Sequence, residues 1–367
     1  MKERLDKMEI YRCFLLPCTS LYDYYKEVMR VIQYIGVLLF FFLVSCEKND
    51  VEPQKTRTLM VYLAGDNNLS GHMQKNISSM MSAWKESYNA NIVIYFDAPN
   101  AAPELYTFRF KGKEVEKQVL KTYEEMDSAD PEVLKKILNE MQDLYPSDSY
   151  GLILGSHASG WIPSGASGRS NRMLHAEPVL TRSFGKDYTG SNEMDTRDMA
   201  KAIPFNKENL EFILFDACLM SSIEVLYDLR DKAKYVIASP AELPAPGFPY
   251  ARVMPYFWGK GKDLEKDLVK VCDEFWDYYN TYNAANRFGT IALIKMDGME
   301  HLFDLTREVL QGKKENVATI DKNAVYCYPM VEYFKYDRFF DLGEYMKYMT
   351  EGREGLYKEY RDFLDNQ

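Results

Sequence analysis

Nearly continuous apolar runs alternate with amphipathic stretches along most of the chain. The runs at residues 58–65, 91–97 and 150–156 are rich in Val, Ile, Leu and Tyr, which is typical of strands buried on both faces of a parallel sheet. Amphipathic stretches at residues 69–86 and 130–144 lie between these runs and predict helices. This alternation predicts an α/β domain whose mostly parallel sheet is flanked by helices on both faces.

The pattern continues in the second half of the chain, with one long interruption and a different tail. Residues 160–193 are rich in Gly, Ser and Arg, and a loop of this length in a compact domain is usually functional or mobile. From Val317 onward the chain is rich in Tyr and predicts a helix near its end. We therefore expect a core over residues 58–260 and a C-terminal helical or mixed extension over residues 261–367. Further elements are predicted at residues 105–120 (a hairpin), 196–202, 210–215, 221–231, 235–238, 263–279, 290–295 and 298–310.

The N-terminal region carries a signal for export. An apolar run over residues 35–44 is short for a membrane span, and it ends in Leu-Val-Ser-Cys at Cys46. Such a run before a small residue and Cys resembles a lipoprotein signal, at which bacteria attach lipid to Cys46 and cleave before it. A short transmembrane anchor is the alternative. Residues 46–57 are polar and predict a tether.

Residues 1–28 fit no part of such a signal, because they are mixed in charge and lie too far before the apolar run. Met29 and Arg30 fit well, so we predict that translation starts at Met29 and that residues 29–45 are the signal peptide. The mature protein would then be lipid-anchored to a bacterial membrane, at the outer membrane or cell surface. Three cysteines besides Cys46 would remain, which leaves at least one thiol unpaired.

Composition narrows the range of partners. The net charge is -10, which argues against nucleic-acid binding, because neutralising phosphates needs clustered Lys and Arg. A hydrophobic content of 46% is enough for a large core. We expect a monomer that acts on soluble, preferably basic, protein or peptide partners.

Two residues at predicted strand ends could carry chemistry. His157 follows the strand at 150–156, and Cys218 follows the strand at 210–215 and precedes a predicted helix at 221. The carboxyl ends of strands are where open α/β sheets build their sites, and a helix N-terminus favours a thiolate. A base 61 residues ahead of a nucleophilic cysteine matches the order in caspase-like enzymes. The alternatives are a buried structural histidine and a small apolar cysteine, a role that Cys272 and Cys327 fit better.

Four segments resemble the clostripain family of the caspase-like clan. They are LILGSHASGW (152–161), LFDACLMSSIEV (214–225), MVYLAGDNNLS (60–70) and ASPAELPAPGFPY (238–250). The block FDACLM is the most specific of them. The resemblance implies a caspase-like fold and the activity of a cysteine endopeptidase.

The resemblance also implies a catalytic dyad. Cys218 would attack the peptide carbonyl, and His157 would protonate the leaving amine and then activate water. Backbone N–H groups of Ala158 and Cys218 would hold the oxyanion. The family usually has Gly where this chain has Ala158, and often Asp where it has Ser156. An alanine can supply the N–H if its φ angle is negative.

Asp216 and Glu242 are the predicted substrate-binding residues. Asp216 lies two residues before Cys218, and the period of a strand turns both side chains to one side. In the family the matching position lines the pocket for Arg or Lys, whose charge a carboxylate complements. Glu242 lies in the segment that resembles the family's substrate side. The alternative role for Asp216 is that of a strand-end carboxylate that binds loop amides.

The family is typically processed in the loop that follows the histidine. In this chain that loop holds four basic residues, and we expect self-cleavage at Arg169 or Arg172, leaving two chains joined through the sheet. The rival function is a surface lipoprotein that keeps the fold as a binding module, which Ala158 would favour. A peptidase of another specificity is a third.

No Cys/His cluster has the spacing of metal ligands. Calcium binding is a possible exception, because some relatives depend on calcium and Asp66 or the acidic loops could supply oxygen ligands. Nothing in the sequence specifies a calcium site.

Overall fold

A computed structural model of the chain describes residues 57–162, 184–190, 193–281, 287–311, 321–328 and 339–365, together with Lys26 and Met29. Contacts divide the chain into two units, residues 1–54 and residues 55–367. The predicted lipidation site Cys46 and the predicted self-cleavage sites Arg169 and Arg172 lie outside the described residues. Within the described part, no helix is long and apolar enough to cross a membrane.

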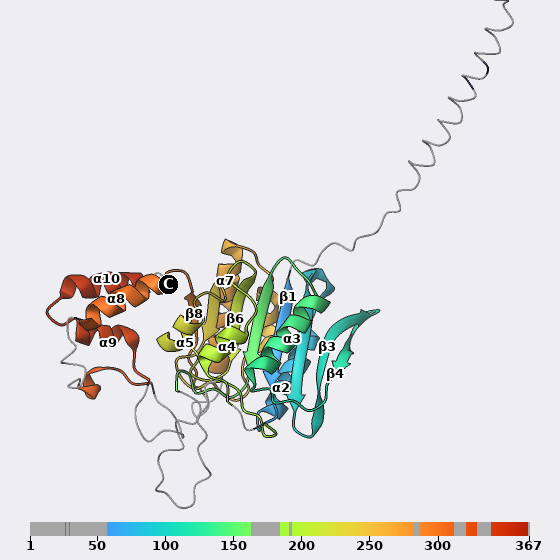
Figure 1. Cartoon of the computed structure of the whole chain (residues 1–367), viewed down its shortest axis with the longest axis horizontal. Coiled ribbons are helices and arrows are strands. Elements are labelled where there is room, and N and C mark those ends of the chain that lie inside the picture. Colours follow the sequence, from blue (N-terminus) through green and yellow to red (C-terminus); the bar gives the residue numbers. More distant parts are fainter. Residues whose placement is uncertain are drawn as a thin grey trace, which may run out of the picture. The chain divides into compact units, whose positions relative to one another are not determined.

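The second unit contains one eight-stranded sheet in the order β4-β3-β2-β1-β5-β6-β7-β8 (Figure 1). The five central strands run parallel to one another, whereas β3 and β4 form an antiparallel hairpin at one edge and β8 is antiparallel at the other. This confirms the predicted mostly parallel sheet. The strands are β1 (Thr58–Ala64), β2 (Asn91–Ala98), β3 (Ala101–Lys111), β4 (Glu114–Thr122), β5 (Tyr150–Gly155), β6 (Leu210–Asp216), β7 (Tyr235–Ala238) and β8 (Ala292–Lys295).

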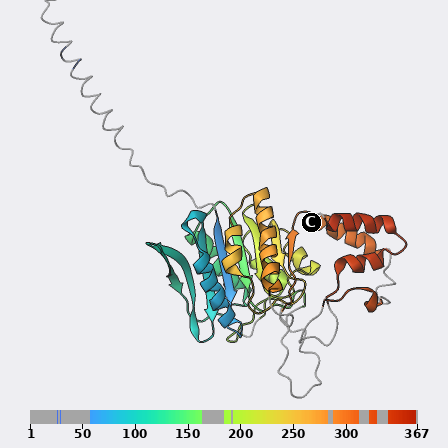
Figure 2. The ribbon, with the colours of Figure 1, turned by 180° about the vertical axis from the view of Figure 1, so that it is seen from behind.

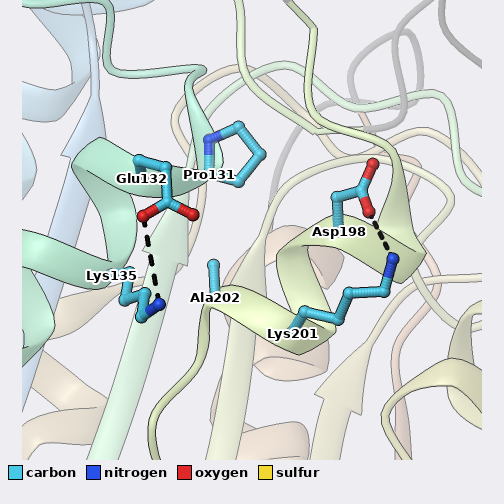
Figure 3. A pocket seen from close by; sticks show the side chains of 6 residues that line it. All are labelled: Pro131, Glu132, Lys135, Asp198, Lys201 and Ala202. Atoms are coloured by element: carbon cyan, nitrogen blue, oxygen red, sulfur yellow. Dashed lines mark hydrogen bonds and ion pairs between the residues drawn. The ribbon is translucent and has the colours of Figure 1, made fainter.

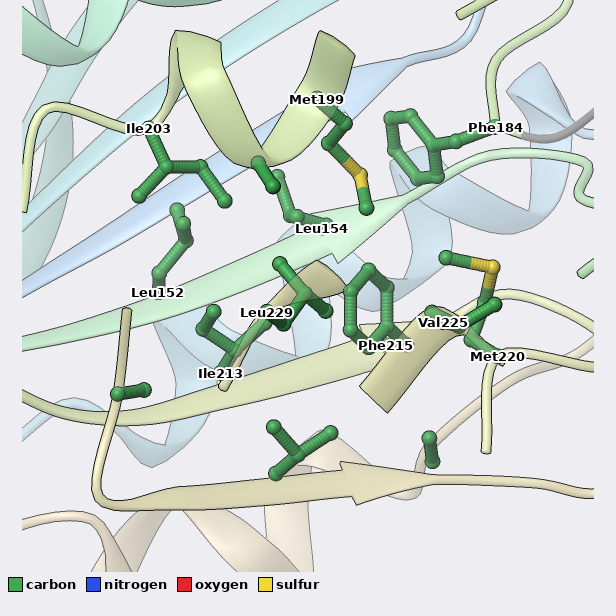
Figure 4. Packing of buried hydrophobic residues seen from close by; sticks show 14 of the residues in the cluster. Leu152, Leu154, Phe184, Met199, Ile203, Ile213, Phe215, Met220, Val225 and Leu229 are labelled. Atoms are coloured by element: carbon green, nitrogen blue, oxygen red, sulfur yellow. The ribbon is translucent and has the colours of Figure 1, made fainter. Parts of the chain in front are cut away.

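Helices cover both faces of the sheet (Figures 1 and 2). Alternate residues of each strand face opposite layers: Leu152 and Leu154 of β5 pack with the residues of one layer, and Ile153 between them packs with the other. The first layer contains α3 (Pro131–Leu144), α4 (Thr196–Ala202) and α5 (Ile223–Asp228). Figure 4 shows the part of its packing in which Met199 of α4 and Val225 of α5 lie over β5 and β6. The second layer contains α2 (Ser70–Ala83), α6 (Tyr250–Val253) and α7 (Lys262–Asn280).

Three C-terminal helices contact one another: α8 (Met299–Gln311), α9 (Leu342–Met349) and α10 (Glu354–Leu364). Their apolar side chains, including Leu302 and Met346, join the same buried cluster as the first layer of the sheet domain. The three helices agree with the helical or mixed C-terminal part that the sequence predicts.

The register between strands fixes the edge where the site is built. Leu63 of β1 pairs with Gly155 of β5, and Gly155 pairs in turn with Asp216 of β6. Because these strands are parallel, the loops that follow them leave the sheet at the same edge.

Candidate active site

His157 and Cys218 occupy equivalent places just beyond the ends of the neighbouring strands β5 and β6. Gly155 and Asp216 pair with each other in the ladder between β5 and β6. His157 lies two residues beyond Gly155, and Cys218 lies two residues beyond Asp216. Adjacent strands are about 4.8 Å apart in a sheet. The ladder therefore brings the candidate base and the candidate nucleophile to the same edge, over neighbouring strands.

His157 is held by contacts from two segments that are distant in sequence. Its Nε2 lies 2.6 Å from Oδ1 of Asn68, on the turn that follows β1. Its carbonyl accepts a hydrogen bond of 2.9 Å from the backbone N–H of Gly185. The imidazole is half-buried, so it is anchored while part of it still faces solvent.

Cys218 is partly exposed, and its sulfur accepts a hydrogen bond from the backbone N–H of Leu243 at 3.3 Å. The pKa of the thiol is raised to about 11, mainly by burial and to a smaller extent by the charges of Glu242 and Asp216, whereas the hydrogen bond from the Leu243 N–H lowers it. In this state the thiol is protonated at neutral pH.

The prediction that a helix N-terminus would lower the pKa of Cys218 is wrong for this state. The helix α5 starts at Ile223 instead of residue 221 and has only six residues. Residues 219–222 form a turn between the cysteine and the helix, and the influence of a helix dipole falls off within one turn. Burial therefore decides the pKa.

An unusual backbone conformation follows the cysteine. Leu219 is buried and has a φ of 65°, in the left-handed region that costs about 1–3 kcal/mol for a residue other than glycine. Its N–H donates to the carbonyl of Ala241 at 3.0 Å. Gly160, with a φ of 64°, lies so close that an added Cβ would collide with the Leu219 carbonyl. The loops after His157 and Cys218 are thus packed against each other, a contact that the sequence did not predict.

Two backbone amides lie beside the dyad with no acceptor among the described residues, those of Ala158 and Cys218. Positive φ angles occur in the described part at three residues other than glycine, and Ala158 is not one of them. The replacement of glycine by alanine therefore leaves the backbone at this position in an ordinary conformation. These are the two N–H groups that would hold the oxyanion according to the resemblance to the clostripain family.

Asp216 faces the segment that follows β7. The hydroxyl of Tyr250 donates to its Oδ2 at 2.9 Å, and Nδ2 of Asn76 lies 3.4 Å from the same oxygen. Burial raises the pKa of Asp216 to about 6, which the hydrogen bonds from Tyr250 and the backbone of Phe248 moderate. The carboxyl is therefore largely ionised at neutral pH.

Gly247 leaves open the space in front of this carboxyl. It has a φ of 70°, and an added Cβ would collide with both carboxyl oxygens of Asp216. Sequence analysis missed Gly247, Tyr250 and Asn76. Gly247 and Tyr250 belong to the Gly-Phe-Pro-Tyr stretch of residues 238–250, the segment that resembles the family's substrate side, so the sequence contained a signal for both. No sequence signal points to Asn76.

The described residues contain no group of three or more His, Cys, Asp or Glu side chains placed to hold a metal ion. Asp66, a possible calcium ligand in the sequence, accepts hydrogen bonds from the N–H and the hydroxyl of Thr189 at 3.2 and 3.0 Å.

A shallow groove lies between α3 and α4 (Figure 3). None of its lining residues belongs to the dyad or to the surroundings of Asp216: Pro131, Glu132, Lys135, Asp198, Lys201 and Ala202.

The sequence of the chain is similar to those of known proteins. The sequence model of the clostripain family matches residues 61–366. Clostripain of Hathewaya histolytica is 29% identical over 254 residues, which are 62% of this chain and 47% of clostripain, so the chain spans about half the length of that relative.

Two solved structures share the fold over most of their length. A secreted C11 cysteine protease from Bacteroides thetaiotaomicron, in complex with an irreversible peptide inhibitor, has a TM-score of 0.69 and 28% identity over 85% of this chain and 82% of that one. An inactive zymogen C11 protease from Parabacteroides distasonis has a TM-score of 0.69 and 31% identity over 84% and 82%. The fold is thus the caspase-like one that the sequence predicted, and the chain belongs to the clostripain family of cysteine peptidases.

Proposed function

We propose that this chain is a cysteine endopeptidase that cleaves after Arg or Lys through the dyad of His157 and Cys218. The observation that carries the proposal is the pairing of Gly155 with Asp216, because it sets both residues of the dyad two positions beyond one rung of the sheet. The segment around Leu243 and Gly247 lies against Cys218 and Asp216, so one segment borders the nucleophile and the carboxylate.

The chemistry follows the usual course of covalent catalysis by a thiol. His157 takes the proton of Cys218 as the sulfur attacks the scissile carbonyl carbon, and the carbonyl oxygen becomes an oxyanion. The N–H groups of Ala158 and Cys218 would stabilise this oxyanion. The C–N bond then breaks as His157 gives its proton to the departing amine. Water, activated by His157, hydrolyses the thioester and restores the thiol.

Asp216 would select a basic residue before the scissile bond. Its carboxylate lies beside the nucleophile. The guanidinium of an Arg or the ammonium of a Lys in the substrate would donate a charge-assisted hydrogen bond to this carboxylate. Glu242 is close enough to raise the pKa of Cys218 and adds a second negative charge to this side. A basic residue entering here would be bound by both charge and hydrogen bonding.

We also propose that the enzyme activates itself by cleavage at Arg169 or Arg172. The family member from Parabacteroides distasonis is described as an inactive zymogen, which supports processing in this chain as well. Both sites lie between β5 and β6, which pair along their length. Two chains produced by the cut would therefore stay joined through the sheet. Wild-type protein and Cys218→Ala that run as the same single intact band would contradict self-cleavage.

Fluorogenic peptides that end in Arg, Lys, Asp or Leu test the proposed activity. We expect hydrolysis after Arg and Lys that disappears in Cys218→Ala and His157→Ala, and a loss of about 10- to 150-fold in Asp216→Asn, because a hydrogen bond to a charged group contributes about 1.5–3 kcal/mol. Silence of all four peptides would favour the binding module. Cleavage only after Asp or Leu would reveal another specificity, and chelator added to the same assays tests for calcium.

Export and lipid attachment at Cys46 complete the proposal. A family member from Bacteroides thetaiotaomicron is described as secreted, which supports export of this chain. Metabolic labelling with a radioactive fatty acid should mark the wild-type protein and not Cys46→Ala. Intact-mass measurement of the exported protein tests the predicted start at Met29, because a mature protein that retained Cys13 or Cys18 would contradict it.

A further inference from the structure

We propose that Asn68 is a positioning residue that fixes the tautomer and orientation of His157. This inference rests on the proposed dyad and goes beyond it, since it adds a third side chain to the catalytic apparatus. Asn68 belongs to the turn after β1, which lies beside β5, and its Oδ1 lies 2.6 Å from Nε2 of His157. The side chain of Asn68 is otherwise exposed.

The turn that carries Asn68 is fixed by its neighbour. The amide nitrogen of Asn67 donates to the carbonyls of Ala64 at 2.9 Å and Lys186 at 2.8 Å, and its oxygen accepts from the N–H of Leu69 at 2.9 Å. Asn67 is fully engaged with backbone and buried. Two adjacent asparagines therefore have different tasks: Asn67 holds the turn, and Asn68 reaches the histidine.

The chemistry of the contact determines which ring nitrogen acts. An amide oxygen only accepts hydrogen bonds, so Nε2 of His157 must carry a proton to bind Asn68. The neutral imidazole then presents its lone pair at Nδ1, which becomes the nitrogen that takes the proton of Cys218 and returns it to the leaving amine. Once the ring is protonated, Nε2 keeps its hydrogen bond, so Asn68 stabilises the same orientation throughout the cycle.

The charged side chains on the segments around His157 are not altered by a substitution at Asn68. Asp66, on the same turn, is bound by Thr189, and the ammonium of Lys186 lies 5.0 Å from the centre of the Tyr188 ring. Glu242 is close enough to Cys218 to raise the pKa of its thiol. A change in the pH dependence of an Asn68 variant would therefore report on the contact with His157.

Two substitutions test the proposal in the full chain, with a Lys or Arg fluorogenic peptide as substrate. Asn68→Ala should lower kcat by about tenfold to a hundredfold with little change in KM, which is part of the 10²–10⁴ that general acid–base catalysis supplies. Asn68→Asp keeps an acceptor oxygen and adds a negative charge, which should raise the pKa of His157 by about one unit or more. Because His157 must be neutral to accept a proton, the acid limb of kcat should move to higher pH.

Asn139→Ala, on the surface of α3, is the matched control and should leave kcat and its pH profile unchanged. Thermal unfolding measurements check that each variant folds. If Asn68→Ala does not fold, the pH profile of Asn68→Asp still tests the proposal. A wild-type kcat in Asn68→Ala, a change in KM alone, or an unshifted limb in Asn68→Asp would overturn the role of Asn68. Wild-type protein that fails to cleave, or cleavage that survives Cys218→Ala, would instead overturn the proposed function.

Discussion

The backbone N–H of Leu243 donates a hydrogen bond to the sulfur of Cys218 at 3.3 Å. The thiol is thus held against the segment that follows β7, where burial keeps its pKa near 11. An ordinary cysteine has a pKa of about 8.5. In the proposed mechanism, Cys218 is therefore a thiol at rest, and the thiolate forms only when His157 takes the proton.

Alkylation of Cys218 by iodoacetamide should accordingly be slow at pH 7 and should accelerate as the pH approaches 11. The thiolate is the reactive form, so the rate follows its population. Mass spectrometric mapping of the modified residue over a pH series measures this, with Cys218→Ala as the background. A rate at Cys218 that is already maximal at pH 7 would show a preformed thiolate and contradict the prediction.

Replacing Tyr250 by Phe should move the acid limb of kcat/KM to higher pH. In the proposed mechanism the Asp216 carboxylate binds the Arg or Lys of the substrate, so activity should fall as the pH drops through its pKa of about 6. The hydrogen bond from Tyr250 lowers that pKa, and Tyr250→Phe removes the bond while the ring remains. Tyr256→Phe, in the short helix after α6, is the control. Identical limbs in both variants would mean that Asp216 does not govern binding.

Gly247→Ala should abolish cleavage after basic residues and destabilise the fold modestly. The added methyl group would collide with the carboxyl of Asp216, and the left-handed backbone adds about 1–3 kcal/mol of strain. Gly112→Ala separates the two effects, because Gly112 has a φ of 67° with no atom within 4 Å of the added Cβ. Peptide assays and thermal unfolding of both variants test this. Equal activity of the two would argue against a binding role for the space at Gly247.

The buried carboxyl of Asp97 should make the protein less stable as the pH rises from about 4 to 8. Burial raises its pKa to about 8, with Asp187, Glu125 and Asp66 adding to the rise, whereas the hydrogen bond from Ser128 lowers it. The folded state then binds a proton that the unfolded chain has released, so the free energy of unfolding falls by up to about 1.4 kcal/mol per pH unit.

Asp97→Asn mimics the neutral acid and should flatten this dependence, whereas Asp148→Asn, at an exposed carboxyl, should keep it. Urea unfolding at several pH values measures both. A slope that persists in Asp97→Asn would assign the dependence to other groups.

Sequence periodicity determined most of the fold because it is a local property. Two predicted elements, at residues 196–202 and 235–238, have the bounds that the structure shows. The predicted bounds are wrong by a few residues at the ends of some helices and strands. The helix predicted over residues 69–86, for example, ends at Ala83. Propensity changes gradually there, whereas hydrogen bonding ends at a single residue.

The sequence by itself also placed the two candidate catalytic residues in the fold, since His157 and Cys218 each follow a nearly continuous apolar run that forms an interior strand. Only the tertiary structure decided what surrounds them. Leu243, Asn68 and Tyr250 reach the site from segments 25 to 89 residues away, and no local pattern encodes such contacts. The pKa of Cys218 was decided in the same way, because desolvation depends on every segment that packs over the sulfur, and here it outweighs a helix that begins too far along the chain.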